Sequence, residues 1–299
     1  IKIQGIDNRF VVFMIDGNRI SGEFAGNIDL SIINIDDIER IEIIRSGMST
    51  LYGSDSMGGL INIITKKNNK FISGDISCNY DLPSNQSLSL GLGLNRNNLS
   101  YKLSLNYYSS PGYDLTGYSP LSNTVEQNLN YKINNSIAYK WNGISIDYMN
   151  QYYAKEVNLY NYRADYESNG APVVVDGLLS DKENSRYKDY MNTLNIGYKN
   201  FKLSFSKELY NKSFYYPYYY APYPNNKDGA TITSANPIRY DFSLLSDIEF
   251  GKHRFLFGLE YAKETYESYD VFNQENTEIL TPSIFLDESQ KTIDEYSIV

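Results

Sequence analysis

The chain has 299 residues, a formal net charge of −9, 30 tyrosines, one cysteine and one histidine. An acidic chain without a long Lys/Arg run is a poor match for nucleic-acid binding, because phosphate contacts need cations. A single cysteine excludes a disulfide within the chain, and one histidine nearly excludes a Cys/His zinc cluster, so we expect no metal or cofactor. No apolar run approaches the roughly 20 residues that a transmembrane helix needs.

Residues 1–66 are predicted to form a small mixed α/β unit. An apolar run over residues 10–15 has the length of a strand and ends at the turn signal Asp16-Gly17-Asn18. Residues 36–39 begin with two aspartates and are predicted to form a short helical turn, because acidic groups favour a helix start. Residues 40–45 and 60–65 are predicted to be two further strands.

From residue 70 onward, apolar and polar residues alternate with a period of two, as in strands that have one apolar face. The clearest run has Leu88, Leu90, Leu92 and Leu94 alternating with serine and glycine. Period alone does not separate a membrane barrel, whose apolar face meets lipid, from a soluble sandwich, whose apolar face meets a core.

The connections separate these two folds better than the strands do. Tight polar turns alternate with long segments, as in membrane barrels with short periplasmic turns and long extracellular loops. The abundant tyrosines and the lysines on the polar faces favour the same fold, so about ten strands of a transmembrane antiparallel barrel are predicted. The tight turns are residues 95–98, Asn142-Gly143, Lys199-Asn200 and Gly251-Lys252, and the long segments are residues 109–124, 154–186, 211–237 and 267–291.

Four sequence blocks in the first 66 residues resemble the plug domain of TonB-dependent outer-membrane receptors, in the family's order and at about its spacing. The turn at Arg45-Ser46-Gly47 departs from the family pattern, which has a proline there. The resemblance implies the second half of a plug at residues 1–69, followed by the first part of the barrel at residues 70–299. The blocks are FMIDG at 13–17, IERIEIIR at 38–45, LYGS at 51–54 and GGLINIITK at 58–66.

The family implies a location in the outer membrane of a Gram-negative-type bacterium and energy-coupled uptake of a scarce large ligand. The implied partners are a TonB-type energising protein, outer-membrane lipid and an extracellular small-molecule or metal-chelate ligand. Residues 27–29 resemble the branch of receptors for siderophores, haem and vitamin B12. Both ends of the chain fall within structural units, so we expect a piece of a longer receptor.

Two sets of plug residues are candidates for a structural role. By resemblance, Glu39, Arg40, Glu42 and Arg45 lie in a strand buried in the lumen and pair with the barrel wall to lock the plug; ordinary surface ion pairs are the alternative. Glycines in the plug turns would permit positive φ or close approach to the wall. They are Gly17, Gly47, Gly53, Gly58 and Gly59.

A tyrosine-rich stretch at residues 213–224 is the candidate ligand-contact loop. Clustered tyrosines could hold an aromatic ligand by stacking and by hydroxyl hydrogen bonds, or could simply continue the aromatic rim of the barrel. The candidates are Tyr215, Tyr216, Tyr218, Tyr219, Tyr220 and Tyr223.

Other functions fit the sequence less well. A passive porin or an adhesin would share the barrel but would have no use for residues 1–66. A hydrolase would need a nucleophile beside a histidine, and His253 follows a predicted periplasmic turn, so we expect no enzyme. Cys78 alternates with Ile76 and Tyr80 and is predicted to face lipid.

Overall fold

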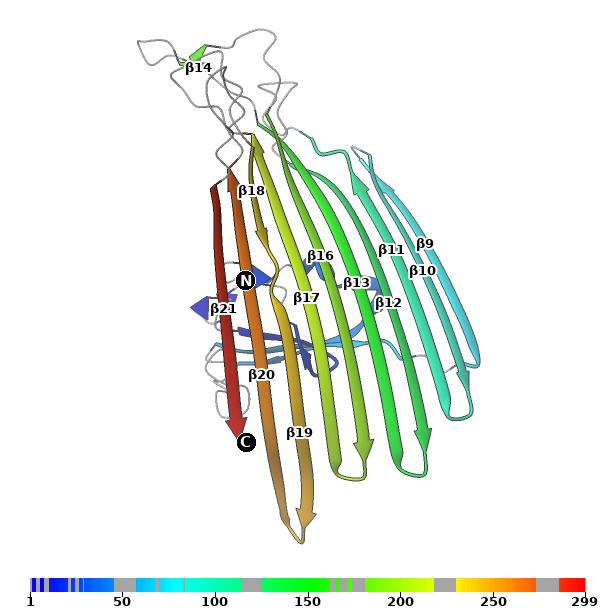
Figure 1. The fold of residues 1–299 in the computed structure, drawn as a ribbon. Helices are drawn as coiled ribbons and strands as arrows, with labels where there is room; N and C mark the ends of the chain where they lie inside the picture. Colours follow the sequence, from blue (N-terminus) through cyan, green and yellow to red (C-terminus); the bar gives the residue numbers. More distant parts are fainter. Residues whose placement is uncertain are drawn as a thin grey trace.

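The structure is a computed structural model in which two sheets dominate (Figure 1). Within its described part, no helix is long and apolar enough to cross a membrane. The described residues are 2–3, 6–7, 11–20, 23–24, 27–28, 30–45, 58–67, 70–82, 84–113, 125–161, 165–166, 172–173, 181–217, 230–272 and 285–298.

The large sheet is built from eleven antiparallel segments, nearly all paired in chain order. Figure 1 shows them as long, tilted strands lying side by side, with their hairpin turns at one end. The segments are β9 (Ile72–Asp81), β10 (Asn85–Arg96), β11 (Leu99–Ser110), β12 (Gln127–Trp141), β13 (Ile144–Asn161), β16 (Asp181–Tyr198), β17 (Phe201–Pro217), β18 (Ala230–Ala235), β19 (Ile238–Phe250), β20 (His253–Phe272) and β21 (Phe285–Ile298).

Two of these segments, β18 and β19, are one interrupted strand. Both pair with β17 and with β20, β18 at one end and β19 at the other. The break falls at Asn236-Pro237, because proline has no N–H to give to a sheet ladder. The Pro237 carbonyl still accepts from Tyr210 N at 3.1 Å, which keeps the strand in line. The described sheet is therefore ten strands wide, which confirms the number expected from the alternation.

The four predicted tight turns are confirmed as two-residue hairpin connections. Each contains a residue with positive φ, namely Asn97 at 54°, Asn142 at 45°, Lys199 at 53° and Gly251 at 64°. Such turns match the natural twist of paired strands.

The strands are longer than predicted. β13, β16 and β17 continue well into the stretches that we assigned to long connections. The prediction was wrong at these ends because it required an apolar face. Backbone pairing continues beyond the part of each strand that has an apolar face. In that continuation, both faces of the strands carry polar residues such as Lys155 and Glu156.

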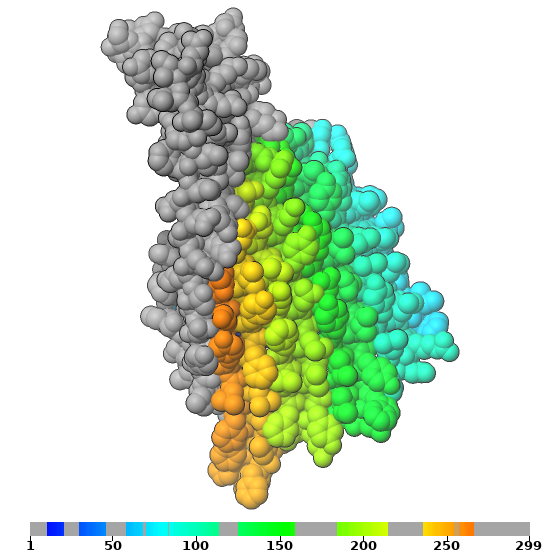
Figure 2. Space-filling view, in the orientation of Figure 1, coloured from blue at the N-terminus to red at the C-terminus, as the bar shows by residue number. Residues whose placement is uncertain are grey.

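The two faces of the large sheet differ in chemistry. Large apolar side chains such as Leu92, Ile137 and Phe205 are exposed on one face, here called the outer face. Figure 2 shows it as a continuous surface over the long strands. Serine, asparagine, glutamine and lysine dominate the opposite, inner face, on which Ser104 and Gln151 are buried. An apolar surface of this extent suits contact with lipid rather than water.

The small sheet packs on the inner face. It has the order β4 (Asn18–Arg19), β3 (Val11–Ile15), β8 (Gly59–Thr65) and β7 (Ile38–Ile44), and β3 and β8 are parallel. The helical turn predicted at residues 36–39 is a 3-10 turn, η3 (Ile35–Asp37), preceded by η2 (Leu30–Ile32). Short strand pairs complete the described elements: β1 (Lys2–Ile3) with β2 (Ile6–Asp7), β5 (Glu23–Phe24) with β6 (Asn27–Ile28), and β14 (Asp165–Tyr166) with β15 (Pro172–Val173).

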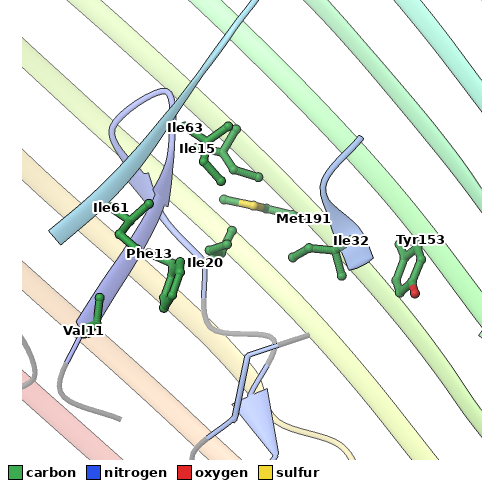
Figure 3. Close-up of a cluster of buried hydrophobic side chains, with 9 residues drawn as sticks. All are labelled: Val11, Phe13, Ile15, Ile20, Ile32, Ile61, Ile63, Tyr153 and Met191. Atoms are coloured by element: carbon green, nitrogen blue, oxygen red, sulfur yellow. The ribbon is translucent and has the colours of Figure 1, made fainter. Parts of the chain in front are cut away.

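One buried cluster joins the two sheets. Figure 3 shows Met191 between the side chains of the small sheet and Ile32, with Tyr153 beside Ile32. Complete burial of each such side chain contributes about 1.5–3 kcal/mol. Val12, Met14 and Leu60 form a separate cluster on the other face of the small sheet. The joining cluster consists of Val11, Phe13, Ile15, Ile20, Ile32, Ile61, Ile63, Tyr153 and Met191.

Candidate functional site

The Asp16-Gly17 turn fastens the end of β3 to β8. Asp16 and Gly17 have φ of 51° and 80°, as a two-residue Asp-Gly hairpin turn requires. The Asp16 carboxylate accepts from Thr65 N at 2.9 Å and from Thr65 Oγ1 at 2.6 Å. Gly17 N donates to Asn62 Oδ1 at 3.0 Å. These bonds fix the small sheet at the end nearest the hairpin turns of the large sheet.

Gly59 is required where β8 begins. Its φ is +122°, and a Cβ built there would lie 2.3 Å from the Ile44 carbonyl oxygen, a backbone atom of the neighbouring strand. Gly58 beside it is buried. The other two candidate glycines, Gly47 and Gly53, lie outside the described residues.

The charged strand β7 does not have the buried surroundings that we expected. Arg40 pairs with Glu39 at 3.0 Å and with Glu42 at 2.8 Å, and its side chain is 54% exposed. Arg45 is also exposed. The physical reason is that the Arg40 and Glu42 side chains point to the face of the small sheet away from the large sheet, where no described element covers them.

The strand register also determines the face of the small sheet to which two of these charged side chains point. Glu42 lies opposite Asn62, whose Nδ2 donates to Glu42 Oε2 at 3.2 Å, and Arg40 lies opposite Ile64. Arg40 and Glu42 therefore lie on the face of the small sheet opposite the cluster that joins it to the large sheet. The locking role of Glu39, Arg40, Glu42 and Arg45 stays a prediction.

The described polar contacts with the large sheet come mainly from residues 30–37. Asn34 caps η3, accepting from Asp36 N at 3.2 Å and donating from Nδ2 to Asp37 Oδ2 at 2.9 Å. This cap presents both aspartates to the inner face. Ser89 Oγ donates to Asp36 Oδ2 at 2.8 Å, and Lys102 Nζ lies 2.8 Å from Asp37 Oδ1.

Asp37 is the electrostatic centre of this contact. Burial raises the pKa of its carboxyl, but the hydrogen bond and the charge of Lys102 and hydrogen bonds from Asn34 and Ser104 outweigh burial. The pKa of Asp37 is therefore lower than its ordinary value. The group is charged at neutral pH and holds the ion pair.

The same segment is bonded further along the inner face. Lys132 Nζ donates to the Ile33 carbonyl oxygen at 2.8 Å. The Ser31 and Tyr153 hydroxyls are 2.5 Å apart, and Lys155 Nζ donates to Ser31 Oγ at 3.3 Å. We call this set of contacts the seam. It joins residues 31–37 to β10, β11, β12 and β13.

Our reading of the sequence missed the seam, although a partial signal was present. Lys102 and Lys132 stand on the polar side of the alternation, which marks them as inward-facing. Asp36 and Asp37 were noticed only as the start of a helical turn. Neither the alternation in the strands nor the acidic helical turn predicts that these lysine and aspartate side chains contact each other.

An open cleft of about 910 Å³ lies between the small sheet and the hairpin ends of the large sheet. Its lining mixes polar and apolar side chains, and the Asp37–Lys102 pair lies on its wall. Other lining side chains include Asp16, Asn134, Asp147 and Lys202. The seam and the cleft therefore share one boundary.

The remaining candidates are placed only in part. Tyr215 and Tyr216 continue the backbone of β17, while Tyr218, Tyr219, Tyr220 and Tyr223 lie outside the described residues. His253 is exposed and begins β20 directly after a hairpin turn. Cys78 is exposed on the outer face, opposite Leu88, as predicted. Within the described residues, no three His, Cys, Asp or Glu side chains group to hold a metal ion.

Comparison with known proteins identifies a matching family and several similar proteins. Residues 1–60 match the family described as TonB-dependent Receptor Plug Domain. The chain is 45% identical over 65 residues to the vitamin B12 transporter BtuB of Photobacterium profundum, covering 22% of this chain and 11% of that protein. It is 38% identical over 94 residues to the iron-regulated outer membrane virulence protein of Vibrio cholerae, covering 29% of this chain and 14% of that protein.

A solved structure extends the likeness to the whole fold. The unliganded ferric citrate transporter FecA superposes with a TM-score of 0.65 at 14% identity, covering 99% of this chain and 46% of that one. The chain thus spans about half the length of this structure.

A plug-domain match over residues 1–60, followed by strands with this fold, supports a fragment of a TonB-dependent outer-membrane receptor. Of its two aligned relatives, one is a vitamin B12 transporter and the other an iron-regulated outer membrane virulence protein. The small sheet is thus the core of a plug, and the large sheet belongs to a barrel wall.

Proposed function

We propose that the protein serves energy-coupled uptake of a scarce, large ligand across the outer membrane. Residues 1–69 act as a gated plug and residues 70–299 as wall. The ligand is a ferric siderophore, haem or cobalamin, and the energising partner is a TonB-type protein. The similarity to a vitamin B12 transporter and to an iron-regulated receptor supports this range of ligands.

The seam is the observation that carries the proposal. Among the described residues, the plug meets the wall through the buried cluster and, at the seam, through a few hydrogen bonds and one ion pair that border a cleft of about 910 Å³. Each such hydrogen bond contributes only about 1 kcal/mol net, so an energised partner can break the polar contacts of residues 31–37, although Ile32 must also leave the buried cluster. Release of residues 31–37 would extend the cleft along the inner face.

The test is uptake by cells that lack their own receptors and express the receptor containing this chain. Radiolabelled ferric siderophores, haem and cyanocobalamin are supplied with and without a functional TonB protein. We expect one ligand to accumulate only when TonB is present. TonB-independent passage of small solutes, without concentration of any ligand, would instead indicate a passive porin and would refute the proposal.

A further inference from the structure

Three asparagines form a row on the outer face of the large sheet, among apolar side chains. Asn135 of β12 lies opposite Asn150 of β13, which in turn lies opposite Asn192 of β16. Asn135 Nδ2 donates to Asn150 Oδ1 at 2.9 Å, and Asn150 Nδ2 donates to Asn192 Oδ1 at 2.9 Å. We call these three residues the asparagine row. It is a chain of side-chain amides that crosses three neighbouring strands.

The asparagine row lies within the apolar part of the outer face. On β12, the exposed side chains of Ile133 and Ile137 flank Asn135 on the same face. Asn150 follows the turn residue Gly143 by seven positions, which is about 23 Å along a strand. A barrel strand tilted by about 35–45° rises about 18 Å over that length, and the apolar band of such a barrel is about 25 Å tall. Around a single barrel, hydrocarbon rather than water would therefore surround the row.

Hydrogen bonds inside the row leave donors and acceptors over. A side-chain amide offers two N–H groups and two oxygen lone pairs. Each link uses one N–H and one lone pair, and Tyr148 Oη donates one more bond to Asn192 Oδ1 at 2.9 Å. Within the described part of the chain, no other group bonds these three amides. Lipid tails offer no partner to the remaining groups, so exposing them to hydrocarbon is costly.

The remaining groups of the row match a second copy of the same row. They carry no formal charge, and donors and acceptors are nearly balanced, so the row is its own complement rather than that of an acidic or a basic partner. Two receptors in one membrane have the same orientation, so a two-fold axis between them runs along the membrane normal. A residue on that axis contacts itself in the other copy. Asn150, at the centre of the row, keeps both an N–H and a lone pair, so it can donate to its copy and accept from it.

The surroundings of the row suit a contact between two proteins. In the next row, the Tyr152 and Tyr190 rings pack with centroids 4.7 Å apart. Lys207, which continues the asparagine row on β17, lies with its Nζ 5.3 Å from the centroid of the Tyr240 ring. The three asparagines span two strand spacings, or about 10 Å, a width that two curved barrel walls can bring together. Apolar and aromatic side chains around a short polar strip resemble a protein interface, where neighbouring contacts exclude solvent from the central ones.

We propose that the asparagine row is the centre of a dimer interface between two copies of the receptor that lie side by side in the membrane. Asn150 of each copy bonds Asn150 of the other, and the tyrosines beside the row pack around this contact. Dimerisation goes beyond the uptake function and does not depend on it.

Sedimentation equilibrium of the purified receptor containing this chain, in density-matched detergent, measures the dissociation constant of the dimer. The test variant combines Asn135→Leu, Asn150→Leu and Asn192→Leu, which makes the row apolar like its surroundings. The matched control is Gln86→Leu, which makes the same exchange of an amide for leucine at an exposed position on the outer face of β10.

We expect the parent receptor to be a dimer and the triple leucine variant to have a dissociation constant about tenfold or more higher, because hydrogen bonds across the interface are lost. Gln86→Leu should associate as the parent does. Asn150→Gln keeps the central amide and should retain most of the association, whereas Asn150→Leu should lose it. The triple variant should still unfold in urea at no lower concentration than the Gln86→Leu control, which separates loss of association from loss of folding.

A monomeric parent receptor would overturn the inference and would leave the row to lipid or to an unrelated partner. An unchanged dissociation constant in the triple leucine variant would also overturn it. So would equal weakening in Gln86→Leu, since association would then not depend on the row. TonB-dependent uptake is measured separately, so failure of the dimer and failure of the uptake function are distinguishable.

Discussion

Asp37 of the plug and Lys102 of the wall form an ion pair of 2.8 Å across a separation of 65 residues in sequence. The side chains are 13% and 25% exposed, so each charge depends on the other for compensation. Asn134 Nδ2 adds a contact of 3.4 Å to the same carboxylate. This pair is the strongest described electrostatic link between plug and wall.

Removing either partner should loosen the plug. Asp37→Asn leaves the Lys102 ammonium without its counter-charge and should destabilise the folded receptor by about 1–3 kcal/mol, measured by urea unfolding in detergent. Lys102→Met should cost a similar amount. In the double variant the two losses should not add, and the coupling energy should be about 0.5–3 kcal/mol. Lys199→Gln, at an exposed hairpin turn, is the neutral control. Strict additivity would show that the pair contributes nothing.

The same ion pair predicts how the plug responds to acid. The pKa of Asp37 is lower in the folded protein than in the unfolded chain, so its stabilising effect is complete above the unfolded pKa of about 4. That effect is lost as pH falls through the lower folded pKa. The backbone-amide hydrogen-exchange rate of residues 30–37, corrected for intrinsic rates, should therefore be constant from neutral pH to about pH 4. Below about pH 4 the corrected rate should increase. In Asp37→Asn the acceleration should be absent or much smaller, and an identical acid profile would contradict the assignment.

Gly59→Ala should destabilise the plug strongly. The added Cβ would lie 2.3 Å from the Ile44 carbonyl oxygen, and backbone cannot move aside cheaply. Positive φ alone costs about 1–3 kcal/mol, and the clash adds to it. Gly143→Ala is the matched control, since Gly143 has φ of +80° but nothing within 4 Å of its added Cβ. The difference between the two losses in unfolding free energy measures the clash. Equal losses would show that the β7 backbone moves aside at little energetic cost.

The extent to which sequence could predict this structure depends on the range of each interaction. The alternation around Leu92 correctly predicted the strands and their outer face, and Asn142-Gly143 correctly predicted a turn. Both predictions succeeded because each signal lies within a few residues of the chain. Arg40 was placed in the correct strand, but its exposure depends on what docks against that face of the small sheet, which no local pattern encodes. The Asp37–Lys102 contact depends on how two separate sheets dock, and nothing local to either residue encodes it.

Residues 31–37 should move away from the wall during uptake. In a receptor with Cys78→Ser, the pair Asp36→Cys and Ser89→Cys can be joined by a short bis-methanethiosulfonate reagent, which forms a disulfide with each thiol and releases methanesulfinate, because the native side chains are 2.8 Å apart. The linked receptor should still bind ligand but should stop TonB-dependent uptake, and reduction of the linker should restore it. The matched control is Ser89→Cys with Asn106→Cys, which joins opposed residues of β10 and β11 within the wall. Because that link leaves the plug free, uptake should continue. Full uptake in the linked plug–wall variant would mean that the ligand passes without release of the seam, and the gating role of residues 31–37 would be wrong.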